Sequence, residues 1–262
     1  MESMIDQYAA TFPIFILIFC RVSGLFIMSP IFSRQNIPVY WKIIFSVLLS
    51  YIILGFASFA TAPKISSFIQ LFIFIIKEFL LGFIFGYITT VMFSAILLAG
   101  QLIDTQIGFG MVNILDPQND IQIPLLGNFN NIIALLLFLI IDGHHALINL
   151  LVISFDMIPI GQFNIEPEIY RALVIIFTKS FELAFKMSLP VVGAALITEG
   201  ALGLMSKSIP QINIFAIGIP IKIFIGLITL FFFIPAYIAL LKGNFSEMLT
   251  DIKMLMEAMM TQ

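Results

Sequence analysis

Charged side chains interrupt several long apolar runs, and they are the residues of this sequence best placed to do chemistry. They are Arg21, Lys77, Glu78, Glu182, Lys186, Glu199 and Lys222. Each would cost about 2.5 to 3.5 kcal/mol if it faced lipid, so each needs a partner. Glu182 and Lys186 are spaced to pair on one helix face. For each residue taken singly, a structural ion pair between packed helices and a conducting role remain equally open.

Asp142, His144 and His145 form a second group that resembles a proton relay or a metal site. Neighbouring imidazoles point to different faces of a helix, and no further ligand follows at metal-binding spacing. We therefore favour a helix end or a loop. The sequence also lacks HExxH, GxSxG and Walker-type motifs, so we predict no catalytic residue, no metal and no cofactor.

Composition determines the class of protein that must position these residues. Of the 262 residues, 61% are hydrophobic and 10% are charged, against roughly 45 to 50% and about 25% in an ordinary soluble domain. The chain is therefore an integral membrane protein. Its net charge of −3 argues against nucleic-acid binding. The acidic start, with Glu2 and Asp6, predicts no cleavable signal peptide.

Apolar windows of about 20 residues predict the membrane helices. They fall near 8–28, 43–60, 66–99, 129–154, 172–204 and 213–241. The third would extend roughly 50 Å against a hydrocarbon core of about 30 Å, so it either breaks or leaves the bilayer. Pro190, Pro220 and Pro235 predict kinked helices or hairpins in the last two runs. Lys and Arg counts in the loops do not decide the orientation.

Two further patterns predict packing. Gly82 and Gly86 form a GxxxG pattern, which is typical of closely approaching helices. From Phe245 to Met260, apolar residues recur at helical spacing opposite acidic ones. We expect this amphipathic tail helix to pack on a partner protein, because an acidic polar face does not suit anionic lipid.

The weakly polar, glycine-punctuated stretch 100–124 lies between two apolar runs. In a membrane, non-helical backbone is tolerated only where it is buried in protein or lines a water-filled space. A plug or constriction is the function that this stretch suits. The candidate gate residues are Gly108, Phe109, Gly110, Met111, Asp116, Pro117 and Gln118. The stretch has no basic residue, and its aspartates either attract cations or are simply solvated; they are Asp104, Asp116 and Asp120.

Several fragments together carry a resemblance. They are Lys77–Gly82 (KEFLLG), Asp116–Gln118 (DPQ), Asp142–His144 (DGH) and Ser208–Phe215 (SIPQINIF), the last continuing to Lys222. In this order and spacing, the chain resembles the FliR family of flagellar biosynthesis proteins along nearly its whole length. It is similar, though less so, to the SctT proteins of virulence type III secretion systems.

The resemblance implies an all-α, polytopic membrane protein of long, kinked helices and helical hairpins. A FliP-like part would cover 1–170, with a plug loop at about 101–128. A FliQ-like hairpin would cover 171–242, and the tail helix 243–262. FliR-like proteins assemble with several copies of FliP and FliQ, and with FlhB, in the bacterial inner membrane of the flagellar basal body. Unfolded flagellar proteins pass through this export gate.

By the same resemblance, Phe109 and Met111 are the apolar stoppers of the plug, and Gly108 and Gly110 are its hinges. We assign Pro210, Gln211, Asn213 and Lys222 to assembly. Their turn can cap a helix, whose lysine then seeks a carboxylate on a neighbouring subunit.

Other functions remain open. A secondary transporter would use Lys77, Glu78 and Glu199 as coupling sites at broken helices, but it would need an internal repeat, and the sequence shows none that is convincing. A membrane scaffold without a pore is a third possibility.

Overall fold

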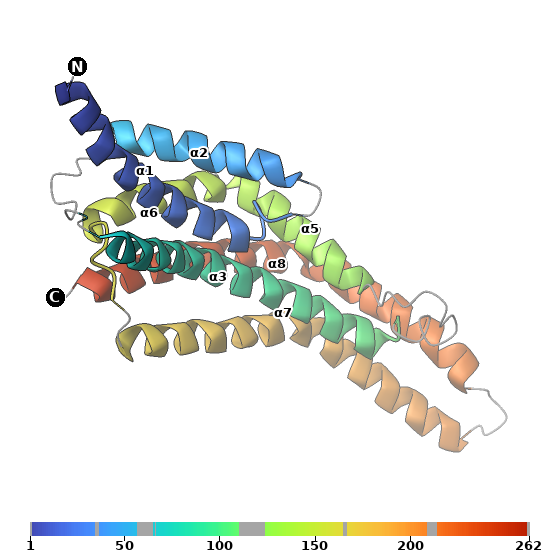
Figure 1. The fold of residues 1–262 in the computed structure, drawn as a ribbon. Helices are drawn as coiled ribbons and strands as arrows, with labels where there is room; N and C mark the ends of the chain where they lie inside the picture. Colours follow the sequence, from blue (N-terminus) through green and yellow to red (C-terminus); the bar gives the residue numbers. More distant parts are fainter. Residues whose placement is uncertain are drawn as a thin grey trace. The chain divides into compact units, whose positions relative to one another are not determined.

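The computed structural model describes residues 2–34, 37–56, 65, 67–109, 124–164, 167–208 and 214–260, and every regular element among them is an α-helix (Figure 1). The helices are α1 (Glu2–Met28), α2 (Val39–Phe56), α3 (Phe68–Ile107), α5 (Leu125–Ile140), α6 (Gly143–Met157), α7 (Pro167–Ser208) and α8 (Ile214–Met260). Five of them are long and apolar enough to cross a membrane, and α5 with α6 forms one further broken candidate. The expected all-α fold of a polytopic membrane protein is thereby confirmed.

The chain forms two compact units. Unit 1 contains Met1–Val91, Asp142–Ile176 and Ser246–Gln262, and unit 2 contains Met92–Ile141 and Phe177–Phe245. Each unit is therefore assembled from segments that lie far apart in the sequence. Helices α3, α7 and α8 each contribute residues to both units.

In unit 1, helix α1 packs directly on the first half of α3. A Cβ atom at Gly82 would overlap the carbonyl oxygen of Arg21, and one at Gly86 would come within 2.8 Å of the Leu25 carbonyl oxygen. Thr90 donates a hydrogen bond from its hydroxyl to the Met28 carbonyl oxygen. The GxxxG prediction of close helix packing is confirmed, because only glycine leaves room for the backbone of α1.

The end of α8 also belongs to unit 1. Its apolar face, which includes Met248, Ile252, Leu255 and Met256, is at most 3% exposed. Our expectation that this face covers a partner protein is therefore wrong, since the chain itself buries it. The tail is also not a separate helix: α8 runs without interruption through Gly243 to Met260.

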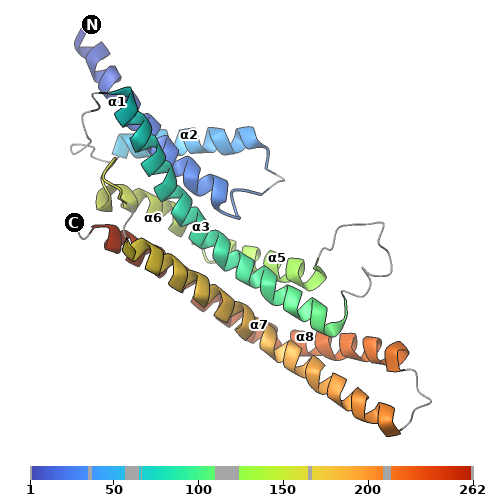
Figure 2. The ribbon, with the colours of Figure 1, turned by 60° about the horizontal axis from the view of Figure 1, so that its bottom comes forward.

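In unit 2, aromatic side chains from α3, α5 and α8 form the packing centre. The ring of Phe138 lies 5.9 Å from that of Phe93 and 5.0 Å from that of Phe245, both in edge-to-face contact. Helices α3 and α5 touch where Gly100 faces Gly127, because a Cβ atom at Gly100 would overlap the Gly127 Cα atom. Helices α7 and α8, coloured from yellow through orange to red in Figure 2, meet where Lys222 Nζ lies 2.9 Å from Glu199 Oε2.

The long helices are continuous in the structure. Helix α3 does not break, since it continues for 40 residues, about 60 Å. Of the two outcomes predicted for this run, the one that remains is a helix that extends beyond the hydrocarbon core of about 30 Å. Helices α7 and α8 likewise run through Pro190, Pro220 and Pro235, because a membrane helix tolerates the single backbone hydrogen bond lost at each proline.

Conversely, the run predicted as one helix over 129–154 is divided. Helix α5 ends at Ile140 and α6 begins at Gly143, with Asp142 in a left-handed conformation (φ 56°) between them. A non-glycine residue rarely adopts this backbone, although aspartate is among those that tolerate it.

Candidate functional site

The end of helix α3 holds the first residues of the predicted plug. Gly108 adopts a positive φ of 97°, which glycine accepts without strain. The backbone N–H groups of Gly108 and Phe109 both donate to the Asp104 carbonyl oxygen, at 3.2 and 3.0 Å. This glycine-closed helix end matches the common C-terminal capping motif, and it fixes the direction in which the chain leaves α3.

The side chain of Asp104 holds the other end of the same segment. Its carboxylate accepts hydrogen bonds from the backbone N–H of Leu126 (3.0 and 3.1 Å) and of Gly127 (3.3 Å). These groups are in the first turn of α5, where backbone donors have no partner within the helix. Asp104 is only 6% exposed. It is thus a helix cap, which neither of the two roles weighed from the sequence had anticipated.

Phe109 packs on an apolar cluster of unit 2, in which helices α3, α5, α7 and α8 all take part. The buried members are Ile103, Ile107, Leu126, Val191, Ala195 and Leu230, and Val192, like Phe109, is partly buried against them. Phe109 itself is partly buried. Asp104 therefore holds both the end of α3 and the start of α5 by hydrogen bonds, and Phe109 packs on the apolar cluster next to them.

A polar group lies on three of these four helices, α3, α7 and α8. Lys222 of α8 pairs with Glu199 of α7 at 2.9 Å, and the Gln106 amide of α3 lies 3.4 Å from the same carboxylate oxygen. Lys222 thus finds its carboxylate within its own chain, where we had expected one on a neighbouring subunit. Its side chain is 18% exposed and that of Glu199 is 57% exposed.

Several predicted residues lie outside the described part of the structure. Those of the plug are Gly110, Met111, Asp116, Pro117 and Gln118, and those of the assembly turn are Pro210, Gln211 and Asn213. The predicted plug loop over 101–128 is also shorter in the structure, because α3 continues to Ile107 and α5 starts at Leu125.

Unit 1 contains the most deeply buried charges. Arg21 and Glu78 are both fully buried, and Arg21 Nε lies 2.6 Å from Glu78 Oε2. Arg21 also donates to the carbonyl oxygens of Ser154 (2.8 Å) and Ile158 (3.0 Å) at the C-terminal end of α6, where a cation is favoured. The second carboxylate oxygen of Glu78 accepts the Gly161 backbone N–H at 2.8 Å.

The Arg21 guanidinium also lies over the Phe155 ring, 4.1 Å from its centroid. Both carboxylate oxygens of Glu78 have a partner, Arg21 and Gly161. The pair therefore joins α1, α3 and the end of α6, and the Glu78 carboxylate is not free to bind a transported ion. Sequence reasoning found Arg21 and Glu78 but missed Ser154 and Gly161. Neither carries a charge that would have marked it.

The remaining charges of the apolar helices do not lie at helix breaks. Glu182 and Lys186 pair at 2.6 Å on an exposed face of α7, as their spacing predicts. Helix α3 is unbroken at Glu78 and helix α7 is unbroken at Glu199. The broken helices that a secondary transporter would need are therefore missing at both proposed coupling sites.

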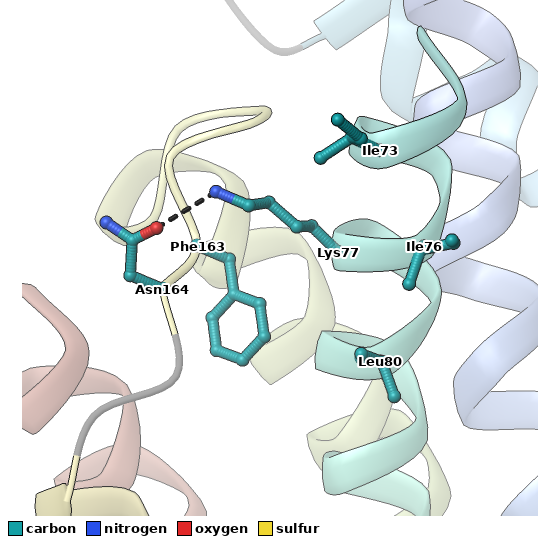
Figure 3. Close-up of a pocket in the computed structure, with 6 residues that line it drawn as sticks. All are labelled: Ile73, Ile76, Lys77, Leu80, Phe163 and Asn164. Carbon is teal, nitrogen blue, oxygen red and sulfur yellow. Dashed lines mark hydrogen bonds between the residues drawn. The ribbon is translucent and has the colours of Figure 1, made fainter. Parts of the chain in front are cut away.

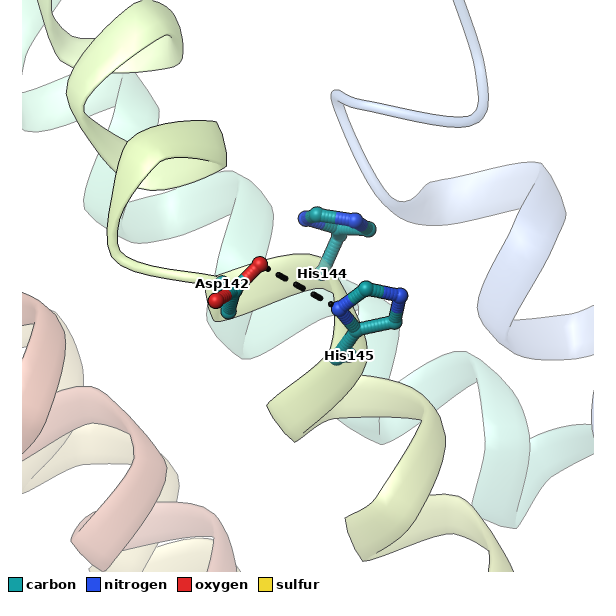
Figure 4. Close-up of side chains that lie close together, drawn as sticks. All are labelled: Asp142, His144 and His145. Atoms are coloured by element: carbon teal, nitrogen blue, oxygen red, sulfur yellow. Dashed lines mark hydrogen bonds and ion pairs between the residues drawn. The ribbon is translucent and has the colours of Figure 1, made fainter.

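Asp142, His144 and His145 mark the start of α6 (Figure 4). His145 Nδ1 lies 3.3 Å from Asp142 Oδ1, and the two imidazole rings lie 4.1 Å apart, closer than expected for neighbouring residues on a helix. Atoms able to bind a metal come within 4.8 Å of one another. However, Asp142 and His145 are more than 70% exposed, and the positive end of a helix dipole disfavours a cation. The helix-end interpretation is confirmed.

The chain is similar to known proteins along most of its length. The profile of the bacterial export proteins, family 1, matches residues 12–248. The flagellar biosynthetic protein FliR of Bacillus subtilis (strain 168) is 33% identical over 249 residues, which cover 94% of both chains. FliR of Aquifex aeolicus is 29% identical over 88% of this chain and 89% of its own. FliR of Escherichia coli K12 is 29% identical over 87% of this chain and 86% of its own.

Proposed function

This chain belongs to the bacterial export proteins, family 1, and we propose that it is an export-gate subunit of the flagellar type III secretion system. It is a membrane component of the flagellar export apparatus, in a family of transport proteins and not of enzymes. In our proposal it assembles in the bacterial inner membrane, at the flagellar basal body, with several copies of FliP and FliQ and with FlhB. Unfolded flagellar proteins pass through the resulting pore.

The anchored segment between α3 and α5 is the observation that carries the gate proposal. Asp104 binds the first turn of α5 through two backbone N–H groups, so the chain leaves and re-enters the helical body at one place. Phe109 adds an apolar contact at that base. A segment held at both ends in this way can block a channel and yield to a passing chain without being lost from its site.

The chemistry of the segment suits a plug. A closed pore must exclude water and ions, yet it must pass unfolded chains of any sequence. Adaptable apolar side chains on a mobile backbone meet both needs better than specific polar contacts. Phe109 and Met111 serve as stoppers in this proposal, with Gly108 and Gly110 as hinges, while Asp116, Pro117 and Gln118 shape the turn.

The long helices support assembly with partner proteins. Helix α7 has 42 residues and α8 has 47, or about 63 and 70 Å at 1.5 Å per residue, against about 30 Å of hydrocarbon. Large apolar side chains of α7 are exposed at every fourth residue; Phe177, Phe181, Phe185 and Leu189 are 42 to 60% exposed. A bilayer covers less than half of such a length, and in our proposal neighbouring subunits cover the apolar faces that stay exposed.

The gate proposal is tested by replacing Phe109 with serine in a complex coexpressed with FliP and FliQ from the same operon. We expect the complex to keep its mass under native detergent conditions, while its ion conductance in planar bilayers in the closed state rises. Phe129→Ser is the matched control, because Phe129 of α5 is 45% exposed and lies outside the apolar cluster. Unchanged conductance in an intact Phe109→Ser complex would remove Phe109 from the gate.

A further inference from the structure

One cavity of unit 1 opens beside the first turns of α3 (Figure 3). Its volume is about 310 Å³, and it is lined by Ile73, Ile76, Lys77, Leu80, Phe163 and Asn164. This is near the lower end of the volumes of ligand sites, about 300 to 1,000 Å³. We call it the Lys77 groove. Its walls are four apolar side chains, and Lys77 is its charged lining residue.

Lys77 and its neighbour Glu78 face in different directions. Glu78 points inward and is compensated by Arg21. Lys77 reaches across the groove, where its Nζ atom donates to Asn164 Oδ1 at 2.9 Å. Among the described residues, this neutral amide is the partner that the structure gives to the ammonium group. An ammonium has three N–H donors, so two remain for an acceptor outside the chain.

An exposed apolar stripe leads to Lys77 along α3. Ile69, Phe72, Ile73 and Ile76 are 71, 56, 47 and 44% exposed. Their spacing is that of one helix face, and it is also the spacing with which one helix docks on another. The stripe therefore fits a helix that lies along the groove.

The depth of Lys77 favours a protein over a lipid headgroup. Lys77 is nine residues from the start of α3 at Phe68, or about 14 Å along the helix, close to half of a hydrocarbon core of about 30 Å. If α3 begins at the bilayer surface, no lipid phosphate is available at this depth. If this part of α3 lies outside the bilayer, the apolar stripe would face water, which soluble surfaces of this size rarely do.

We propose that a helix of a partner subunit docks in the Lys77 groove. Its apolar side chains cover Ile73, Ile76 and Leu80, and an Asp or Glu on the same face pairs with the Lys77 ammonium group. The identity of this partner as an export-gate subunit rests on the proposed function. Because the carboxylate meets one fixed cation, the pair sets the register of the docked helix along α3.

A photocrosslinking amino acid at position 73 tests the proposal in the coexpressed complex. We expect it to capture a peptide of a partner subunit that contains an Asp or Glu. Lys77→Glu should reduce this crosslink at least tenfold, whereas Lys77→Arg should keep it. Changing the identified acid to lysine should restore the crosslink to the Lys77→Glu variant. Lys42→Glu, on α2 of the same unit, is the control and should leave the crosslink unchanged.

Other outcomes would overturn the proposal. They are capture of phospholipid alone at position 73, and a partner crosslink that is indifferent to Lys77→Glu. The native mass of the wild-type complex distinguishes failure of the groove proposal from failure of the gate proposal. If that complex forms and position 73 meets only lipid, the groove proposal fails and the gate proposal stands. If the wild-type chain forms no complex with FliP and FliQ, both fail.

Discussion

Removing the carboxylate of Asp104 should release the start of helix α5 while the rest of unit 2 stays folded. Asp104 binds the backbone N–H groups of Leu126 and Gly127, and a hydrogen bond to a charged group contributes about 1.5 to 3 kcal/mol. Loss of a helix cap costs about 0.5 to 2 kcal/mol. Because Asp104 is only 6% exposed, water replaces these contacts poorly. For Asp104→Ala we expect a local loss of about 2 to 4 kcal/mol.

Amide hydrogen exchange measures this loss directly. The N–H groups of Leu126 and Gly127 should exchange about 30 to 700 times faster in Asp104→Ala, since each 1.4 kcal/mol is tenfold. Asp104→Asn keeps one oxygen acceptor without the charge, so its effect should be intermediate. Thr105→Ala is the matched control, because its exposed hydroxyl donates to the Gln101 carbonyl oxygen of its own helix.

Two results would refute this reasoning. In the first, the two amides exchange at the wild-type rate in Asp104→Ala. In the second, Asp104→Asn is as severe as Asp104→Ala, which would mean that the acceptor oxygen is not what holds α5. In the assembled gate, we expect the same Asp104→Ala variant to raise closed-state conductance, because one end of the plug has lost its anchor.

Two other predictions concern unit 1. Glu78→Ala should lower the free energy of unfolding by about 3 to 5 kcal/mol, because it leaves Arg21 buried without its counter-charge. The double change Arg21→Met with Glu78→Leu should recover most of this loss, and thermal unfolding in detergent compares the two variants. Gly82→Ala should lower the unfolding temperature, because its methyl group would overlap the Arg21 carbonyl oxygen, at a cost of about 1 to 3 kcal/mol or more. Gly193→Ala is its control: among the described residues, no atom outside its own helix backbone lies within 4 Å of a Cβ there, so a lowered unfolding temperature in both variants would contradict the packing argument.

The structure gives the two kinds of intramembrane charge different roles. Arg21 and Glu78 bind each other and link α1, α3 and α6. Lys222 and Glu199 hold α7 to α8 at a partly exposed site. Each pair therefore fixes how helices pack within its own unit. A transporter would instead need a carboxylate that is free to bind and release its ion.

The sequence by itself determined the class of this protein and its local features. A composition of 61% hydrophobic residues requires burial in lipid or in other protein, and runs of that length must be helical. The pairing of Glu182 with Lys186 also follows from sequence alone, because residues four apart always meet on a helix. The GxxxG pattern at Gly82 likewise predicts a close helix contact from sequence alone, although it does not specify the partner helix.

Only the tertiary structure decided which distant residues meet. The partner of Arg21 is 57 residues away, that of Asp104 is 22 and 23 residues away, and that of Lys222 is 23 residues away. No local rule selects one carboxylate or amide over another at such separations. The tail of α8 shows the same limit, because an amphipathic face reveals that it will be covered but not by what. Its burial within unit 1, and the cap that Asp104 places on α5, depend on how the helices pack, which is a property of all contacts together.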